Sequence, residues 1–380
     1  MKNRNNISAE QYLNELYSLS EKIGASDIHL TTGEVPYLRT EGILTPVDGA
    51  EVIKPGTCDA VAISLALNTI APGVENPAEE VLKRLFSSGA IDGATTSPNG
   101  YRYRFNVYRE NNSTAVAMRR LDDKFLSLSE LGLPARLEAF CGYPDGLVIV
   151  TGPTGSGKST TLATLIDMIN RNRNGHIITI EDPVEYIHKS DKCLVHQRQI
   201  GRDATSFNAA LVESLRQDPD VILVGEIREI ETIRTAITAA ETGHLVFATL
   251  HASDCVGAIE RFISVFPEGE QSSVRHQLSL VLRGVFAQHL LPSAKEGATR
   301  VVCGELLFTT TGIANLIATG RSQQIYSALE TGRNAGMQTM EYDLARLLSF
   351  GLITEQTAHS MSRNPNLRSG WTFASGREPL

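Results

Sequence analysis

Eight residues in the middle of the chain have the types and spacing of a phosphate-binding loop. The segment Gly152-Pro-Thr-Gly-Ser-Gly-Lys-Ser159 matches G-x-x-x-x-G-K-[ST] in full. Its glycines let the backbone curl so that N–H groups point inward at phosphate oxygens, and the following helix adds its dipole. Lys158 would reach the β- and γ-phosphates of a nucleotide, and the Ser159 hydroxyl would hold Mg²⁺. The predicted phosphate-binding residues are Gly152, Pro153, Thr154, Gly155, Ser156, Gly157, Lys158, Ser159 and Thr160.

Carboxylates follow two further apolar runs. Ile180-Glu-Asp-Pro-Val-Glu185 places Glu181, Asp182 and Glu185 after one strand-like run, and Asp220-Val-Ile-Leu-Val-Gly-Glu226 ends another in Glu226. Ligands of open α/β sheets bind outside the carboxyl ends of the strands, so we expect these side chains near the phosphates. One carboxylate would orient or deprotonate the attacking water, and Glu226 would support Mg²⁺ through water. Spacing alone leaves open whether Glu185 or Glu226 is the base.

Two histidines bracket one more strand-like run, Gly243-His-Leu-Val-Phe-Ala-Thr-Leu-His251. A strand over Leu245–Leu250 would put His251 at its carboxyl end, on the phosphate side, and His244 at the opposite end. On this geometry we favour His251 as the sensor of the γ-phosphate. The role of His244 stays open.

The elements that must position these groups alternate between strand and helix patterns, which predicts a parallel sheet flanked by helices. The expected strands are Leu147–Thr151, Ile177–Glu181, Val221–Val224 and Leu245–Leu250, and the expected helices are Lys158–Asn170, Phe207–Arg216 and Ile230–Thr242. In Lys158–Asn170 the apolar residues recur at the spacing of a packed helix: Leu162, Leu165, Ile166 and Ile169. After about residue 255 the pattern turns mostly helical, most clearly in Gln277–Leu291 and Met340–Phe350.

Residues 8–120 have the pattern of a mixed α/β module. Ala9–Lys22 carries a helical apolar stripe, and Pro36–Leu44 and Tyr101–Arg109 alternate as strands do. In Tyr101–Arg109 the alternation puts Arg102 and Arg104 on the face away from the core, available to a partner. The Gly- and Pro-containing segment from Leu121 to Gly146 is then expected to be a linker and hinge.

Composition excludes several other classes of protein. A net charge of −8 disfavours wholesale binding to nucleic acid, and no apolar run is long enough to span a bilayer. The five scattered cysteines have no C-x-x-C spacing, which indicates isolated thiols in a reducing compartment. We therefore expect a cytosolic protein without nucleic-acid partners, with docking on a membrane machine still open.

The motifs occur together and in this order in the type II/type IV secretion ATPase superfamily, and the chain resembles the PilT-like retraction ATPases of type IV pili. The resemblance extends from Ala25-Ser-Asp-Ile-His-Leu30 to about Ile353. Its most specific segments are Val150–Thr161, Ile178–Ile187, Asp218–Ile227, Ala239–His251 and Gly336–Met340.

This resemblance implies an α/β protein: a PAS-like α+β domain over residues 1–121, a linker over 122–146, and a RecA-like P-loop ATPase domain over 147–363 with a helical C-terminal part. A polar tail over 364–380, with Trp371, follows. The resemblance further implies a homohexamer that binds ATP and Mg²⁺ between the two domains. It assigns Glu185 to the acidic box, Glu226 to Walker B and both histidines to the histidine box. Arg102, Arg104 and Arg119 are implied to complete the site.

Two departures from the family pattern stand out. Asn112 occupies a position at which related chains often carry arginine, and Arg109 is the expected substitute. Gly312-Ile-Ala-Asn-Leu-Ile-Ala-Thr319 lacks both arginines and the glutamate of the corresponding family helix. This second change indicates either surface drift or an altered output of the motor.

Together these observations predict an ATP-hydrolysing hexameric motor for pilus retraction and twitching motility, docked at the inner face of the cytoplasmic membrane. Its expected partners are an inner-membrane platform protein and, as a further candidate, a paralogous motor ATPase. Three alternatives remain: a motor of a secretion system or a conjugative pilus, a weakly catalytic accessory subunit, and a nucleic-acid translocase. The acidic net charge disfavours the last of these.

Overall fold

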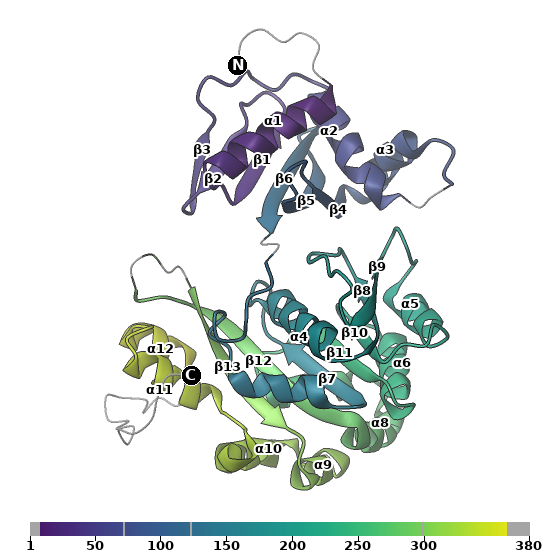
Figure 1. Cartoon of the computed structure of the whole chain (residues 1–380), viewed down its shortest axis with the longest axis vertical. Coiled ribbons are helices and arrows are strands. Elements are labelled where there is room, and N and C mark those ends of the chain that lie inside the picture. Colours follow the sequence, from purple (N-terminus) through teal and green to yellow (C-terminus); the bar gives the residue numbers. More distant parts are fainter. Residues whose placement is uncertain (1–7, 71–72, 122–123, 296, 298–299, 363–380) are drawn as a thin grey trace. The chain divides into compact units, whose positions relative to one another are not determined.

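The computed structural model describes residues 8–70, 73–121, 124–295, 297 and 300–362 (Figure 1). Contacts divide the chain into two compact units. The first comprises Met1–Lys124, Glu181–His188 and Gln197–Ser206, and the second comprises Phe125–Ile180, Lys189–His196 and Phe207–Leu380. The acidic segment Glu181–Glu185 therefore groups with the N-terminal elements. The predicted tail over 364–380, with Trp371, lies outside the described residues.

The first unit is an antiparallel sheet with helices packed on it. Its strands, in spatial order, are β3 (Ile43–Pro46), β2 (Tyr37–Thr40), β1 (Asp27–Thr31), β6 (Ser113–Leu121), β5 (Arg102–Glu110) and β4 (Ala90–Thr96). Its helices are α1 (Ala9–Lys22), α2 (Thr57–Ala66) and α3 (Pro77–Ser88), with a 3₁₀ turn, η1 (Leu67–Thr69), after α2. Ser8 caps α1 in a capping box with Gln11, as the residue types favour.

The alternation in β5 is confirmed. Tyr103, Phe105 and Val107 are fully buried in the core of the first unit, while Arg102 and Arg104 lie on the other face. The single strand predicted over Pro36–Leu44 is wrong, because the chain turns at Glu41 and Gly42 and pairs β2 with β3. Both turn residues have positive φ, the conformation of a tight hairpin turn.

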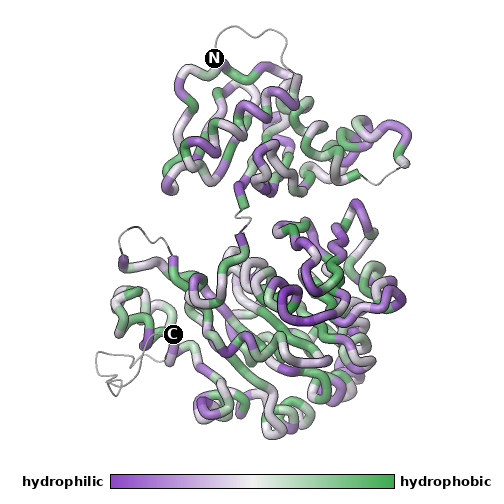
Figure 2. The backbone as a smooth tube through the Cα atoms, in the orientation of Figure 1, coloured by the Kyte–Doolittle hydropathy of each residue, from purple (hydrophilic) through white to green (hydrophobic). Residues whose placement is uncertain are grey.

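The second unit contains a mixed seven-stranded sheet. Its order is β13 (Arg300–Phe308), β12 (Leu282–Pro292), β7 (Gly146–Thr151), β11 (Leu245–Leu250), β10 (Val221–Val224), β8 (Gly175–Glu181) and β9 (Cys193–Gln199). The pairs from β12 through β8 are parallel, and β13 is antiparallel to β12. Every residue of β7, β10 and β11 is buried, as expected for parallel strands covered on both faces, and these strands are hydrophobic along their length (Figure 2).

Helices cover both faces of this sheet. On one face, α4 (Lys158–Asn172) and the 3₁₀ segment η2 (Ala135–Gly142) share a core cluster with Val148 and Val150 of β7. On the other face α6 (Ile230–Glu241) and α7 (Cys255–Ser264) pack against the same strand. The apolar stripe predicted for α4 is confirmed, since all four of its residues are at most 2% exposed. The remaining helices before β12 are α5 (Phe207–Ser214) and α8 (Glu268–Val281).

The helix predicted over Gln277–Leu291 is confirmed only as far as Val281 and is wrong from Leu282 onward. Helix α8 ends at Val281, and Leu282 begins β12, which pairs with β7 on one side and β13 on the other. A strand buried on both faces has a continuous apolar sequence, which periodicity alone does not distinguish from a buried helix. Gly284 marks the strand, because a Cβ there would lie 2.5 Å from Phe140 and from the Leu307 carbonyl oxygen.

The C-terminal part is helical, as predicted. It consists of α9 (Thr311–Ala318), η3 (Ser322–Gln324), α10 (Ile325–Thr331), η4 (Gly332–Ala335), α11 (Met340–Ser349) and α12 (Glu355–Met361). Leu128, Leu133, Leu137 and Phe140, within the segment expected to be a linker, are buried in the core of the second unit. Within the described residues, none of the helices has the length and apolar character needed to cross a membrane.

Candidate active site

The phosphate-binding loop connects β7 to α4, in the strand–loop–helix context that its chemistry requires. Gly152, Gly155 and Gly157 all have positive φ, of 146°, 76° and 89°. Gly157 is the N-cap of α4 and no side chain caps this helix, so its first N–H groups face the loop. The buried Ser156 hydroxyl has no hydrogen-bond partner among the described residues. These features fit a cradle for phosphate oxygens.

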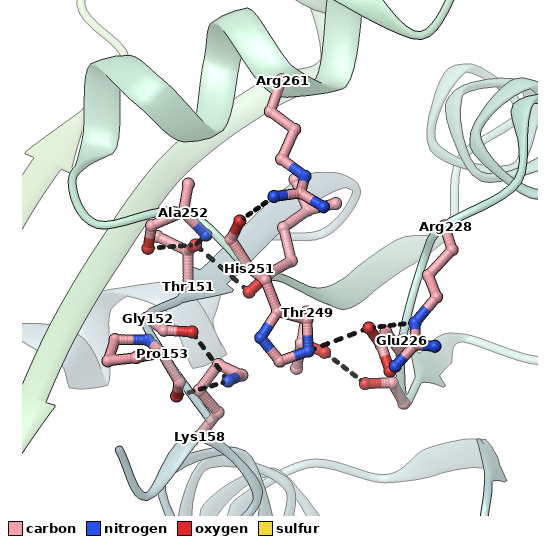
Figure 3. A network of polar contacts seen from close by, with 12 residues as sticks. Thr151, Gly152, Pro153, Lys158, Glu226, Arg228, Thr249, His251, Ala252 and Arg261 are labelled. Carbon is pink, nitrogen blue, oxygen red and sulfur yellow. Dashed lines mark hydrogen bonds and ion pairs between the residues drawn. The ribbon is translucent and has the colours of Figure 1, made fainter. Parts of the chain in front are cut away.

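Lys158 lies across the loop (Figure 3). Its Nζ donates to the carbonyl oxygens of Gly152 and Pro153, at 2.9 and 3.0 Å. Partial burial lowers the pKa of Lys158, and the nearby Glu226 carboxylate opposes that shift. The ammonium group is thus held over the loop by two neutral carbonyls, which a phosphate oxygen can replace with a stronger, charge-assisted bond.

Glu226 and His251 lie next to each other at the carboxyl ends of neighbouring strands (Figure 3). Glu226 Oε1 is 2.9 Å from His251 Nε2, and it also accepts from Nε of Arg228. The strand register explains why Glu226 and His251 lie next to each other. Val224 pairs with Ala248, so Glu226, two residues later, lies level with Leu250, which pairs with Thr151 before the loop. Lys158, Glu226 and His251 therefore converge, as predicted from their places after strands.

Two buried threonines fix the strand ends that carry these groups. Thr151 Oγ1 accepts from the Ala252 N–H at 2.8 Å and lies 3.0 Å from the Ala252 carbonyl, which ties the loop to the segment after His251. Thr249 Oγ1 donates to the Gly225 carbonyl, next to Glu226. Arg261 Nη1 donates to the His251 carbonyl at 2.6 Å. These bonds hold the backbone at Gly225, His251 and Ala252, next to the points from which the Glu226 and His251 side chains extend.

The structure does not bring His244 to this group within the chain. It lies at the amino end of β11, where its carbonyl accepts from Gly146 N–H and its Nδ1 is 2.9 Å from the Ala239 carbonyl. His244 and His251 are thus separated by the length of a six-residue strand, about 20 Å at the usual rise per residue.

The acidic segment contacts the arginines of β5 within the first unit. Arg104 Nη1 donates to Glu185 Oε1 at 3.1 Å, and Arg102 Nη2 donates to the Val184 carbonyl at 3.0 Å. Burial and the nearby Arg202 lower the pKa of Arg102, and Glu181 opposes the shift. Glu181 itself accepts from Gln197 Nε2 at 3.2 Å, and the bond from Asp182 to Pro183 is cis.

Arg119, expected beside these arginines, is opposite Arg104 in the β5–β6 ladder, and its Nε donates to Asp27 at 2.8 Å. The Asn112 departure has a local reason. Asn111 and Asn112 form the turn between β5 and β6 with φ of 49° and 62°, a conformation that asparagine tolerates better than arginine. Arg109, the expected substitute, contacts this turn: its Nη2 donates to the Asn112 carbonyl at 2.8 Å, and its guanidinium lies over the Phe86 ring.

Sequence reasoning missed the contribution of β12 to the site. Gln288 contacts Ser156 in the loop, and His289 Nε2 is 2.9 Å from the Ser253 carbonyl, two residues after His251. The one signal in the sequence is a polar pair inside an apolar run. The apolar run around this pair is equally compatible with a buried helix, so the pair alone does not predict a strand.

The residues present fit a nucleotide and its Mg²⁺. Ser159 is exposed in the first turn of α4, and Glu226 is partly exposed, with 22% of its side chain accessible. A hydroxyl and a carboxylate at this place match the oxygen ligands that Mg²⁺ prefers. All five cysteines are free thiols, and among the described residues no three His, Cys, Asp or Glu side chains are grouped so that they could hold a metal ion.

Comparisons with known proteins agree with this geometry. The family described as Type II/IV secretion system protein matches residues 3–363. The type IV pilus retraction ATPase PilT of Pseudomonas aeruginosa is 41% identical over 353 residues, which cover 93% of this chain and 98% of that protein. A twitching motility protein of Neisseria gonorrhoeae is 44% identical over 72% of this chain and 73% of its own length.

Solved structures give the same result. The crystal structure of the pilus retraction motor PilT with bound ADP matches with a TM-score of 0.82 at 40% identity, covering 93% of this chain and 97% of that one. The ATPase DotB of Legionella pneumophila matches with a TM-score of 0.81 at 26% identity, covering 95% and 97%. This chain belongs to the Type II/IV secretion system protein family and is a P-loop ATPase of that family.

Proposed function

We propose that this chain is an ATP-hydrolysing motor that powers retraction of a type IV pilus. One observation carries the ATPase part: Lys158, Glu226 and His251 converge beside an open phosphate-binding loop. The retraction part is supported by relatives described as a pilus retraction ATPase and a twitching motility protein.

In this proposal the chain binds ATP by its loop amides and Lys158, with Mg²⁺ held by Ser159 and by Glu226 through water. Mg²⁺ supplies charge neutralisation at the phosphates. Glu226 orients and deprotonates the attacking water, and His251 holds the Glu226 carboxylate in place and senses the γ-phosphate. The other residues that we propose to take part are Glu181, Asp182, Glu185, His244, Arg102, Arg104, Arg119 and Thr160.

Glu226 is a better candidate for the base than Glu185 in this structure. Glu226 lies within the second unit together with Lys158, whose pKa it influences. Glu185 instead forms an ion pair with Arg104, which is part of the first unit. We propose that this arginine partner changes during the catalytic cycle and that Arg102 and Arg104 then neutralise charge on the transferred phosphoryl group.

The assembly that we propose is a homohexamer in the cytoplasm, docked at the inner face of the cytoplasmic membrane on a platform protein. We propose a paralogous motor ATPase as a further candidate partner. We propose no nucleic-acid partner, given the net charge of −8.

The test is the phenotype of Lys158→Ala in the cells that encode this chain. A retraction motor predicts abundant, persistent pili and loss of twitching, whereas bald cells would assign the chain to pilus assembly instead. The exposed Lys192, changed to alanine, is the matched control and should leave pili and twitching normal. Purified wild-type protein that releases no more phosphate than the Lys158→Ala variant would point to the accessory-subunit alternative.

A further inference from the structure

A glutamine on β12 lies directly beneath the phosphate-binding loop. Gln288 is 1% exposed, and its amide connects two parts of the nucleotide-binding segment. Its Nε2 donates to the Ser156 carbonyl at 2.6 Å, and its Oε1 accepts from the Thr161 hydroxyl at 2.7 Å. One side chain thus joins the loop, the first turns of α4 and the neighbouring strand of the sheet.

The loop lies close to β12 at two of its glycines, Gly152 and Gly157. A Cβ at Gly152 would lie 2.2 Å from the Gln288 carbonyl oxygen, and a Cβ at Gly157 would lie 3.2 Å from Gln288 Nε2. These glycines therefore serve the packing of the loop on β12 as well as its curl. The contact at Gly152 is with the backbone of β12, whereas the contact at Gly157 is with the side chain of Gln288.

The bond to Ser156 has a directional consequence. In a planar trans peptide, the C=O and the following N–H point in opposite directions. Because Gln288 holds the Ser156 carbonyl toward β12, it turns the Gly157 N–H toward the interior of the loop, where phosphate oxygens bind. The Ser156 carbonyl, which can only accept, fixes the Nε2 end of the Gln288 amide toward the loop, and the Thr161 hydroxyl then donates to Oε1.

We propose that Gln288 is a positioning residue for nucleotide binding, which aims the loop N–H groups at the phosphates without touching the nucleotide. Loss of its amide leaves the buried Ser156 carbonyl unpaired, so the loop relaxes toward conformations with fewer inward N–H groups. This inference rests on the nucleotide-binding part of the proposed function and is independent of the pilus. The inference thus gives β12 a role in nucleotide binding, which is to hold the Ser156 carbonyl of the loop from outside the loop.

The experiment compares Gln288→Met, Gln288→Glu and Thr161→Val with wild type. Binding of ADP and of inorganic tripolyphosphate is measured by calorimetry, together with the melting temperature and with kcat and KM for ATP. Gln338→Met is the matched control. Its Nε2 also donates to a backbone carbonyl at 2.7 Å, that of Gly304, but away from the loop.

We expect Gln288→Met to weaken ADP about tenfold, which corresponds to about 1.4 kcal/mol. Tripolyphosphate should weaken by the same factor, because the change lies in the phosphate cradle and not at the base or ribose. Thr161→Val should give a smaller loss in the same direction. The melting temperature should stay close to that of Gln338→Met.

Equal ADP and tripolyphosphate affinities in wild type and Gln288→Met would overturn the inference while leaving the proposed ATPase intact. Failure of wild type itself to bind ADP would instead refute the nucleotide site. If Gln288→Met does not fold, Gln288→Glu decides, because it keeps the shape and the Thr161 bond but loses the donor to Ser156. Unchanged tripolyphosphate affinity in Gln288→Glu would then sink the role of the donor.

Discussion

The three charged or titratable groups at the centre of the candidate site, Lys158, Glu226 and His251, come from separate segments and have different kinds of partner. Lys158 is bonded to two loop carbonyls, and Arg261 holds the carbonyl of His251. Glu226 has two side-chain partners, His251 and Arg228, on the same oxygen. We therefore expect ATP hydrolysis to depend on the negative charge of the Glu226 side chain more than on its size.

Glu226→Gln keeps the size of the side chain and removes its charge. We expect ATP hydrolysis to fall at least about a hundredfold, the usual contribution of a general base, while ADP affinity changes little. His251→Ala should lower the rate less, because the Glu226 carboxylate remains and loses only one of its two side-chain partners. Phosphate-release assays and ADP calorimetry check both variants.

His359→Ala, at an exposed position on α12, is the histidine control and should hydrolyse ATP at the wild-type rate. A Glu226→Gln variant with near wild-type turnover would remove this residue from the catalytic role.

At the scale of elements, the connection between β8 and β9 contains the acidic segment and, after it, a buried histidine, His188. His188 is 8% exposed, and its backbone N–H donates to Gln197 of β9 at 2.8 Å. Burial lowers the pKa of His188 from 6.5 to about 4. The neutral imidazole is therefore the form that the folded segment accommodates.

This shift predicts a pH dependence of stability. Because the folded pKa lies below the unfolded value, the contribution of His188 is fully present above pH 6.5 and is lost as the pH falls toward 4. The slope from this group is at most about 1.4 kcal/mol per pH unit. Denaturant unfolding of wild type and His188→Gln at several pH values between 7 and 4 measures it.

We expect the free energy of unfolding of His188→Gln to decline less steeply over that window than that of wild type. His359→Gln should follow the wild-type slope, since His359 is exposed. Parallel slopes for wild type and His188→Gln would show that another group governs the acid sensitivity.

At the scale of the whole molecule, the acidic segment groups with the first unit although β8, which leads into it, starts in the second. Arg104 and Glu185 form an ion pair within the first unit, and the side chain of Arg104 is 46% exposed. Hydrolysis that uses Glu226 and these arginines together would require both units of the chain.

Arg104→Ala tests that requirement. We expect kcat to fall by about a hundredfold or more, within the range by which arginines act in phosphoryl transfer, with ADP affinity nearly unchanged. Arg84→Ala is the control, because Arg84 also pairs with a carboxylate of its own unit, Glu80 at 3.2 Å, on α3. Equal turnover in Arg104→Ala and wild type would confine catalysis to the second unit.

The sequence alone determined which groups are candidates for binding and hydrolysing ATP, because each follows a short apolar run. Strand ends in a parallel sheet gather at one edge, so Lys158, Glu226 and His251 could be placed together without coordinates. The buried stripe of α4 and the outward arginines of β5 followed from periods of 3.6 and 2. These are local properties of the chain.

Only the tertiary structure decided which residues outside the motifs support the candidate site. Strand β12 is buried on both faces, so its sequence shows no alternation and was assigned to a helix. Its pairing with β7 puts Gln288 under the loop and His289 beside the segment after His251. The ion pair between Glu185 and Arg104 likewise could not be predicted from the sequence. The two residues are 81 positions apart, so their contact depends on how distant elements pack. The sequence indicated the candidate reacting groups, and the pairing of elements distant in the sequence decided which residues contact them.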